Sequence, residues 1–232
     1  MSVEKRRLLV VAPHPDDEIL GAGGVMARFA RAGGEVTVLT VAAHMPPLYP
    51  AAVHERTVAE ARKAHALIGV ARSIFLDNPA VLLGAIPLPE FNGAIQRVVD
   101  EVQPQVMLIP FPDRHIDHRQ VFEAAMVAAR PVRAGKAIGA LAAYETLSET
   151  HWNAPHLEPS FTPNWCVDVT DVMPLKLDAL RCFESQIPAA EGPRSLAAVE
   201  ALAVFRGSQV GFARAEAFHI LRLSLSPESL LG

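Results

Sequence analysis

The sequence predicts a single α/β domain with a Rossmann-like, mostly parallel sheet that carries helices on both faces. Short, continuous apolar runs alternate along the chain with longer segments of helical period, which is the pattern of successive βαβ units. The runs lack the polar alternation of half-exposed strands, so we expect strands that are buried on both faces. A length of 232 residues suits one domain with a sizeable core.

The first part of the chain supplies most of the expected sheet. Apolar runs predict strands at residues 8–12, 35–41, 71–76 and 106–110. Helical spacing predicts helices over residues 19–32, 53–69, 87–102 and 119–130. Asp16 and Asp17 stand where an N-cap and a first-turn acid belong, and Gly69 stands at a C-cap position.

The C-terminal part has a less regular pattern. It predicts strands at residues 140–145, 165–169 and 217–223, and helices at residues 174–186 and 195–205. Frequent prolines at 155–163, 188 and 193 indicate surface loops. Because no domain boundary is visible, we expect one domain over residues 1–232. Its core is residues 7–145, and residues 146–232 form an extension that completes the pocket.

Composition and charge argue against several classes of partner. Apolar residues make up 50% of the chain and charged residues 20%, which is typical of a globular protein. The net charge is -4 and no basic stripe is present, so nucleic acid is not an expected partner. No apolar run near the start is long enough for a signal peptide or a membrane span, and we expect a cytoplasmic protein. Cys166 and Cys182 form no CxxC pair and are expected to be free thiols.

The turn after the first expected strand is unusually rich in titratable groups. A nucleotide-binding protein of this class would carry GxGxxG here, whereas this chain carries His14, Asp16, Asp17 and Glu18. A catalytic zinc site takes three nitrogen or oxygen ligands and leaves a position for water. One of the two aspartates can bind a metal while the other faces the water as general base. The alternative is that the aspartates only cap the helix, which leaves His14 unexplained.

A second polar turn follows the expected strand at residues 106–110. It contains His115, Asp117 and His118, and His118 opens the next helix. Parallel strands end at the same edge of a sheet, so the two turns can converge and His118 can complete a His, Asp, His zinc site. His115 can then support an oxyanion from the far side, and Asp117 is a candidate to orient His115. Alone, this HxDH motif is weak, because many surface loops contain two histidines.

Together the two turns resemble a known family. The motifs are APHPDDE at residues 12–18, then Leu20-Gly21 and Gly23-Gly24, and HIDHR at residues 115–119. They are similar to those of the LmbE-like family, which includes the N-acetylglucosaminyl-phosphatidylinositol de-N-acetylases and the deacetylases of mycothiol and bacillithiol biosynthesis. Weaker similarity at residues 176–186 and 207–222 extends the resemblance over nearly the whole chain.

The resemblance implies a Rossmann-like fold and zinc-dependent removal of an acetyl group from an amino sugar. It implies that His14, Asp17 and His118 bind the zinc and that Asp16 is the general base. It also implies that His115 polarises the carbonyl or stabilises the tetrahedral intermediate. Since two histidines and one aspartate suit several metals, another divalent ion such as Fe²⁺ is an alternative to Zn²⁺.

Two positions depart from the family pattern. Members usually carry an arginine three residues before a glutamate on the second helix, where it contacts substrate. Here Thr57 holds that place before Glu60, and Arg56 precedes Glu60 by four residues. Arg56 is therefore a substrate-binding candidate, with a surface i,i+4 pair as the alternative. Phe183 stands where members often carry a histidine, so a polar contact is lost and substrate selection is expected to differ.

Other residues are candidates of lower weight. His44 follows the second strand at the binding edge and can line the pocket, although a surface histidine is the alternative. Glu145, at the end of a strand, is a candidate for a sugar hydroxyl. The glycines at 21, 23 and 24 cost helix stability, and we interpret them as sites of close backbone packing.

The sequence thus predicts a zinc-dependent deacetylase that acts on an N-acetylglucosamine derivative as a small-molecule substrate. One alternative is a zinc amidase on a larger thiol or sugar conjugate. Another is a non-catalytic metal or sugar-binding protein, against which the complete set of ligands and base argues. Homo-oligomerisation is expected by analogy with the family.

Overall fold

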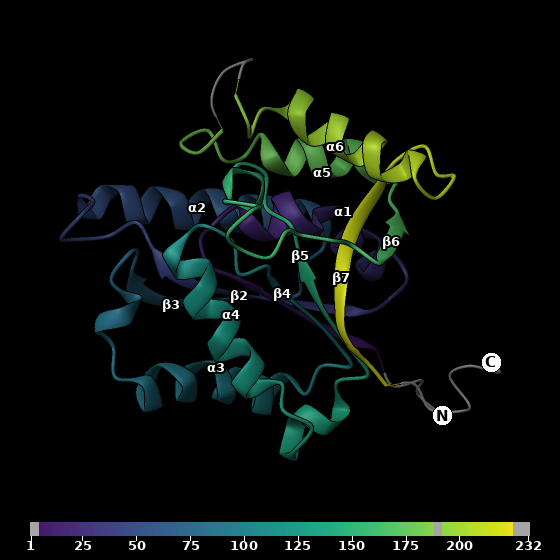
Figure 1. Cartoon of the computed structure of the whole chain (residues 1–232). Coiled ribbons are helices and arrows are strands. Elements are labelled where there is room, and N and C mark those ends of the chain that lie inside the picture. The colour runs from purple at the N-terminus through teal and green to yellow at the C-terminus, as the bar shows by residue number, and fades with distance from the viewer. Residues whose placement is uncertain (1–4, 188–191, 225–232) are drawn as a thin grey trace.

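A seven-stranded sheet lies between two layers of helices (Figure 1) in this computed structural model, which describes residues 5–187 and 192–224. The strand order is β3-β2-β1-β4-β5-β7-β6. The strands are β1 (Arg7–Ala12), β2 (Glu35–Ala43), β3 (Arg72–Pro79), β4 (Val106–Pro110), β5 (Ala140–Tyr144), β6 (Trp165–Asp168) and β7 (Ala215–Leu223). The α-helices are α1 (Asp17–Arg31), α2 (Ala51–Ile68), α3 (Leu88–Val102), α4 (Ile116–Ala128), α5 (Met173–Leu180) and α6 (Leu196–Ser208).

The centre of the sheet is parallel, as the sequence predicts. β1 pairs with β2 on one side and with β4 on the other, and Val10 is in register with Val38 and Leu108. The apolar runs become these strands because both faces of the central sheet are covered by helices. Only β7 runs against its neighbours: it is antiparallel to both β5 and β6 and lies between them.

The two helical layers bury separate parts of the core. Helices α1, α2, α5 and α6 cover one face of the sheet, and α3 and α4 cover the other (Figure 1). Ile19, Met26 and Phe183 belong to the first apolar cluster, and Phe91 and Ile95 belong to the second. The predicted α/β class with helices on both faces is therefore confirmed.

The glycines of α1 permit close packing, as the sequence analysis proposed. A Cβ atom on Gly21 would lie 2.1 Å from Cδ2 of Tyr144, and one on Gly24 would lie 2.7 Å from Cγ1 of Val169. Tyr144 is fully buried, and its hydroxyl donates a hydrogen bond of 2.8 Å to the carbonyl of Val11. The glycines thus let α1 approach β5 and the segment after β6.

A buried ion pair ties the first helix to the last strand. Nζ of Lys176 lies 2.6 Å from Oε1 of Glu216, and both side chains are under 5% exposed. The ammonium also donates to the carbonyl of Leu20 at 2.8 Å. The carboxylate accepts from the backbone N–H groups of Gly24 (2.7 Å) and Val25 (2.8 Å). Both charges are thereby satisfied by each other and by the peptide groups of α1.

Asp16 and Asp17 hold the predicted N-cap and first-turn positions of α1, whereas the predicted end of the fifth helix is wrong. Asp16 occupies the N-cap position of α1, but its side chain makes no capping hydrogen bond, and its backbone is left-handed with φ of 114°. The fifth helix ends at Leu180 rather than at residue 186, and the chain continues in turns through residue 187. Gly69 does cap α2, with φ of 84°.

Over the part of the chain that is described, no helix combines the length and the apolar character that crossing a bilayer requires.

Replacing Lys176 with methionine is expected to lower the free energy of unfolding by about 3 kcal/mol, because the substitution leaves Glu216 charged and buried without its cation. Urea denaturation measures this change. The matched control is Arg181→Met, which removes an exposed ion pair with Asp178 and is expected to change stability by less than about 1 kcal/mol. Equal stability of the two variants would show that the buried ion pair of Lys176 and Glu216 does not stabilise the fold.

Candidate metal centre and active site

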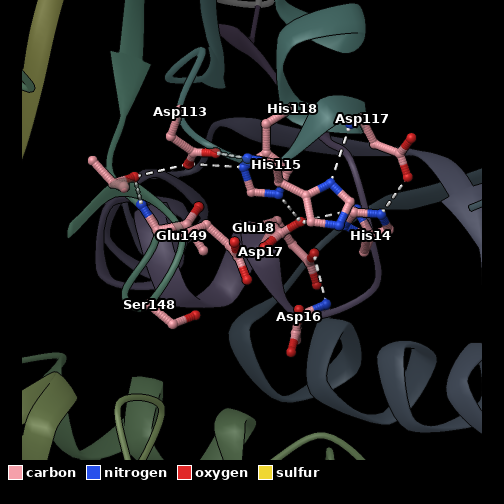
Figure 2. A network of polar contacts seen from close by, with 12 residues as sticks. His14, Asp16, Asp17, Glu18, Asp113, His115, Asp117, His118, Ser148 and Glu149 are labelled. Atoms are coloured by element: carbon pink, nitrogen blue, oxygen red, sulfur yellow. Dashed lines mark hydrogen bonds and ion pairs between the residues drawn. The ribbon is translucent and has the colours of Figure 1, made fainter. Parts of the chain in front are cut away.

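The two polar turns meet at the carboxyl edge of β1 and β4, where the strand order reverses direction. His14 follows β1 by two residues, and the HxDH segment forms the start of α4. Figure 2 shows the imidazole and carboxylate groups of both turns gathered in one cluster. A polar cavity of about 250 Å³ opens beside it, lined by His14, Asp16, His44, Tyr49, Ala80, Val81, His115, Glu149, Gln186 and Arg194.

Asp17 lies at metal-ligand spacing from two histidines. Oδ2 of Asp17 lies 3.2 Å from Nδ1 of His14 and 3.2 Å from Nε2 of His118. Tetrahedral zinc with ligands at its usual bond lengths places ligand atoms roughly 3.3–3.5 Å apart. Nε2 of His118 is buried without a hydrogen bond, which suits a nitrogen that faces a cation. The set therefore fits a divalent metal.

A second set of three nitrogens is also close enough to share a cation. His14, His115 and His118 each offer one ligand atom, and these atoms lie within 4.8 Å of one another. His115 is the least buried of the three, and its Nδ1 already accepts a hydrogen bond of 3.1 Å from the backbone N–H of Asp117. The two sets share His14 and His118 and differ in whether Asp17 or His115 supplies the third ligand.

Two aspartates fix the outer nitrogens of the paired histidines. Oδ2 of Asp117 lies 2.8 Å from Nε2 of His14, and Oδ2 of Asp113 lies 2.9 Å from Nδ1 of His118. Carboxylates in this position set the tautomer and the ring orientation of metal-binding histidines. Figure 2 shows Asp113 and Asp117 on opposite sides of the cluster.

The prediction that Asp117 orients His115 through its carboxylate is therefore wrong. Its carboxylate was expected to orient His115, but it binds His14 and also accepts the N–H of Val81 at 2.8 Å. The reason lies in the first turn of α4, where the Asp117 side chain turns back toward β1. His115 is oriented instead by the backbone N–H of Asp117.

Asp113 is a site residue that the sequence analysis did not identify. Its side chain is fully buried and contacts His118, the backbone N–H of His115 (2.9 Å) and the hydroxyl of Thr150 (3.0 Å). The signal that could have revealed Asp113 in the sequence is its place in the HxDH loop, five residues before His118.

His14 and His118 have raised pKa values, and Asp17 between them has a lowered one. Burial alone would lower the pKa of His14 and that of His118, but hydrogen bonds and charges from neighbouring aspartates raise them to about 9 and about 10. Burial alone would raise the pKa of Asp17, yet His118 and His14 hold it well below its usual range. Metal binding at this site is therefore coupled to proton release.

Asp16 occupies a strained and buried position at the cavity wall. It is 1% exposed, and its left-handed backbone is uncommon for a residue other than glycine, at a cost of about 1–3 kcal/mol. Its N–H donates to Oε2 of Glu18 at 3.2 Å, and Glu18 in turn contacts His65 at 3.0 Å. Burial and the nearby charge of Asp17 raise the pKa of Asp16 to about 8, although Arg194 opposes the rise.

His115 and His44 both face the cavity. The ring of His115 lies edge-on to His14 with centroids 4.7 Å apart, and burial together with the charges of neighbouring histidines lowers its pKa. His44 stacks on His14 at 5.9 Å and meets Tyr49 edge-on at 4.8 Å. Burial lowers the pKa of His44 to about 4, so the ring is neutral at physiological pH.

The structure places Arg56 and Glu145 away from the cavity lining. Arg56 is half exposed and pairs with Glu60 at 2.9 Å, which is the alternative that its spacing allowed. Glu145 is held by two hydrogen bonds from Arg206 (2.8 and 2.7 Å) and by a contact with His151 at 3.0 Å. Phe183 is fully buried in the apolar core. Gln186 and Arg194, which the sequence analysis did not single out, do line the cavity.

A larger groove of about 600 Å³ between α3 and α4 lacks this chemistry. Its lining is mainly apolar, and none of the histidines of the cluster contributes to it. The smaller polar cavity is therefore the candidate active site.

Comparison with known proteins identifies the family of this chain. The sequence profile of the PIG-L family, described as GlcNAc-PI de-N-acetylase, matches residues 9–129, which is more than half of the chain. The chain belongs to the PIG-L family. The matched residues of this PIG-L protein include both polar turns and the strands that carry them.

Two curated relatives are named as deacetylases. The chain is 34% identical over 155 residues to the 1D-myo-inositol 2-acetamido-2-deoxy-alpha-D-glucopyranoside deacetylase of Streptomyces avermitilis, with 53% of each protein covered. It is 28% identical over 199 residues to the diacetylchitobiose deacetylase of Thermococcus kodakarensis, with 79% of this chain and 71% of the relative covered. The chain thus spans about half the length of the first relative.

The fold is also found among solved structures. The N,N'-diacetylchitobiose deacetylase of Pyrococcus horikoshii superposes with a TM-score of 0.75 and 22% identity, covering 99% of this chain and 90% of that one. This PIG-L protein therefore shares its fold over almost its entire length.

Asp113→Ala is expected to weaken metal binding about 10–100-fold, because His118 loses the carboxylate that orients it. Competition with a chromophoric chelator measures the affinity. Asp100→Ala removes an exposed aspartate of α3 and is expected to leave the affinity unchanged. Unaltered affinity in the Asp113 variant would show that this contact does not support the metal site.

Proposed function

We propose that this protein is a metal-dependent N-deacetylase that hydrolyses the acetamide of an N-acetylated amino sugar. The observation that carries the proposal is the buried cluster in which Asp17 lies 3.2 Å from both His14 and His118 while Asp16 faces the same cavity. Family membership and the names of the two curated relatives support the reaction class.

The proposed metal ligands are His14, Asp17 and His118. A cation bound there supplies Lewis acidity toward the acetyl carbonyl and lowers the pKa of water in its coordination sphere. Zinc is the metal we propose, because two nitrogens and one carboxylate oxygen suit its catalytic sites, with Fe²⁺ as the alternative.

Asp16 is proposed as the general base. Its carboxylate takes a proton from the attacking water and passes it to the departing amine. The Asp16 carboxylate lines the same cavity as His14 and His115, which places a base beside the proposed ligands.

His115 is proposed to donate a hydrogen bond to the developing oxyanion. Because its Nδ1 accepts the N–H of Asp117, the proton of the neutral ring is carried on Nε2. The lowered pKa keeps the ring neutral, and the ring lines the cavity.

The substrate is proposed to be an N-acetylglucosamine derivative. His44 lines the cavity and is proposed to contact the substrate. Arg56 and Glu145 are not proposed as substrate-binding residues, because each pairs with another residue of the protein. A cytoplasmic location, a homo-oligomeric assembly and a pocket completed by residues 146–232 stay predictions.

Asp16→Asn is expected to retain bound metal while its kcat falls about 10²–10⁴-fold, because the base is lost but the ligands are not. His118→Ala is expected to lose both metal and turnover. The measurements are metal content by mass spectrometry and free amine released from a panel of N-acetylglucosamine derivatives. His219→Ala, which replaces a histidine of β7 that does not line the cavity, serves as the control. Near-normal kcat in the Asp16 variant would refute its role as base.

His115→Ala is expected to keep its metal and to lose about 10²–10³-fold in kcat, the typical effect of removing one oxyanion donor. This result separates the proposed role from that of a third nitrogen ligand. Loss of the metal from the variant would instead make His115 part of the coordination set.

A further inference from the structure

Arg194 is the one basic side chain that reaches the carboxylate of Asp16 among residues 5–187 and 192–224. Its Nη1 lies 3.3 Å from Oδ2 of Asp16, and 178 positions separate the two residues in the sequence. The side chain is 25% exposed and lines the cavity. No other hydrogen bond to the Asp16 carboxylate is present in the described part of the chain.

The guanidinium is itself held in place from a second direction. Its Nε donates to Oγ of Ser148 at 3.0 Å, and its Nη2 donates to Oε1 of Glu149 at 3.2 Å. Both acceptors lie on the buried segment after β5, and Figure 2 shows them beside the cluster. Three acceptors on two separate segments leave the planar fork of an arginine little freedom to rotate.

Asp16 is thus held by hydrogen bonds through both its backbone and its side chain. Its backbone N–H is bound by Glu18, and its carboxylate is bound by Arg194.

We propose that Arg194 is a positioning residue that holds the Asp16 carboxylate in the orientation required for proton transfer. The proposal rests on the proposed function, in which Asp16 is the general base. The proposal places Arg194 on Asp16 because one of its three described hydrogen bonds goes to the Asp16 carboxylate and the other two hold the guanidinium against Ser148 and Glu149.

The test is a double-mutant cycle on released amine, with kcat and KM measured separately. Arg194→Ala is expected to lower kcat about 10–100-fold with KM nearly unchanged, because a displaced catalytic group loses rate rather than affinity. In the Asp16→Asn background the same substitution is expected to cost nothing further. Arg194→Lys is expected to recover part of kcat, and added guanidinium is expected to rescue Arg194→Ala.

The matched control is Arg114→Ala. Arg114 contacts the other carboxylate oxygen of Glu149 at 3.4 Å but not Asp16, so its loss is expected to leave kcat unchanged. An equal loss in both arginine variants would overturn the proposal and assign the effect to Glu149. A rise in KM alone would make Arg194 a substrate-binding residue, and an additive loss in the cycle would show that it does not act through Asp16.

Failure of the proposed function is distinguishable from failure of this inference. Normal turnover by Asp16→Asn would reject the base assignment without involving Arg194. If the wild-type protein releases no amine from any acetylated sugar, crystal structures of the wild type and Arg194→Ala decide the matter. An Asp16 carboxylate that is displaced or adopts two conformations in the variant supports the positioning role. An unmoved carboxylate overturns it. If Arg194→Ala does not fold, the same comparison is made with Arg194→Lys.

Discussion

The parallel pairing of β1 with β4 is the constraint on which the site depends. Because these strands are neighbours and run in the same direction, the turns that follow them emerge at the same edge of the sheet. The strand order reverses between them, so their crossover helices lie on opposite faces and leave a crevice at the edge. His14 and His118, which are over a hundred residues apart in the sequence, become neighbours as a result of this pairing.

The site gathers buried negative charge that the rest of the fold must balance. Six acidic side chains around it are each under a tenth exposed: Asp16, Asp17, Glu18, Asp113, Asp117 and Glu149. Positive charge reaches these carboxylates from the guanidinium of Arg194, which contacts both Asp16 and Glu149. A divalent cation held by His14, Asp17 and His118 would add positive charge at the centre of the same cluster.

Local pattern was sufficient for the elements and for the two turns, but not for the contacts between distant segments. Each central strand lies within a few residues of its apolar run, because burial on both faces requires such a run. The partner of Asp117 was not predictable, since it depends on a side-chain rotamer in the first turn of α4. Arg194 was missed because nothing near it in the sequence differs from an ordinary surface loop, and its meaning comes only from a contact made across 178 positions.

The contacts that Glu216 makes with α1 have a consequence for biosynthesis. The helix that begins with Asp17 is synthesised well before Glu216, which binds its middle peptide groups. At ordinary translation rates about 10–40 s separate the two. Throughout that interval the turn of His14 and Asp17 is present without the strand that anchors its helix, so the contacts that Glu216 makes with α1 can form only after β7 has been synthesised.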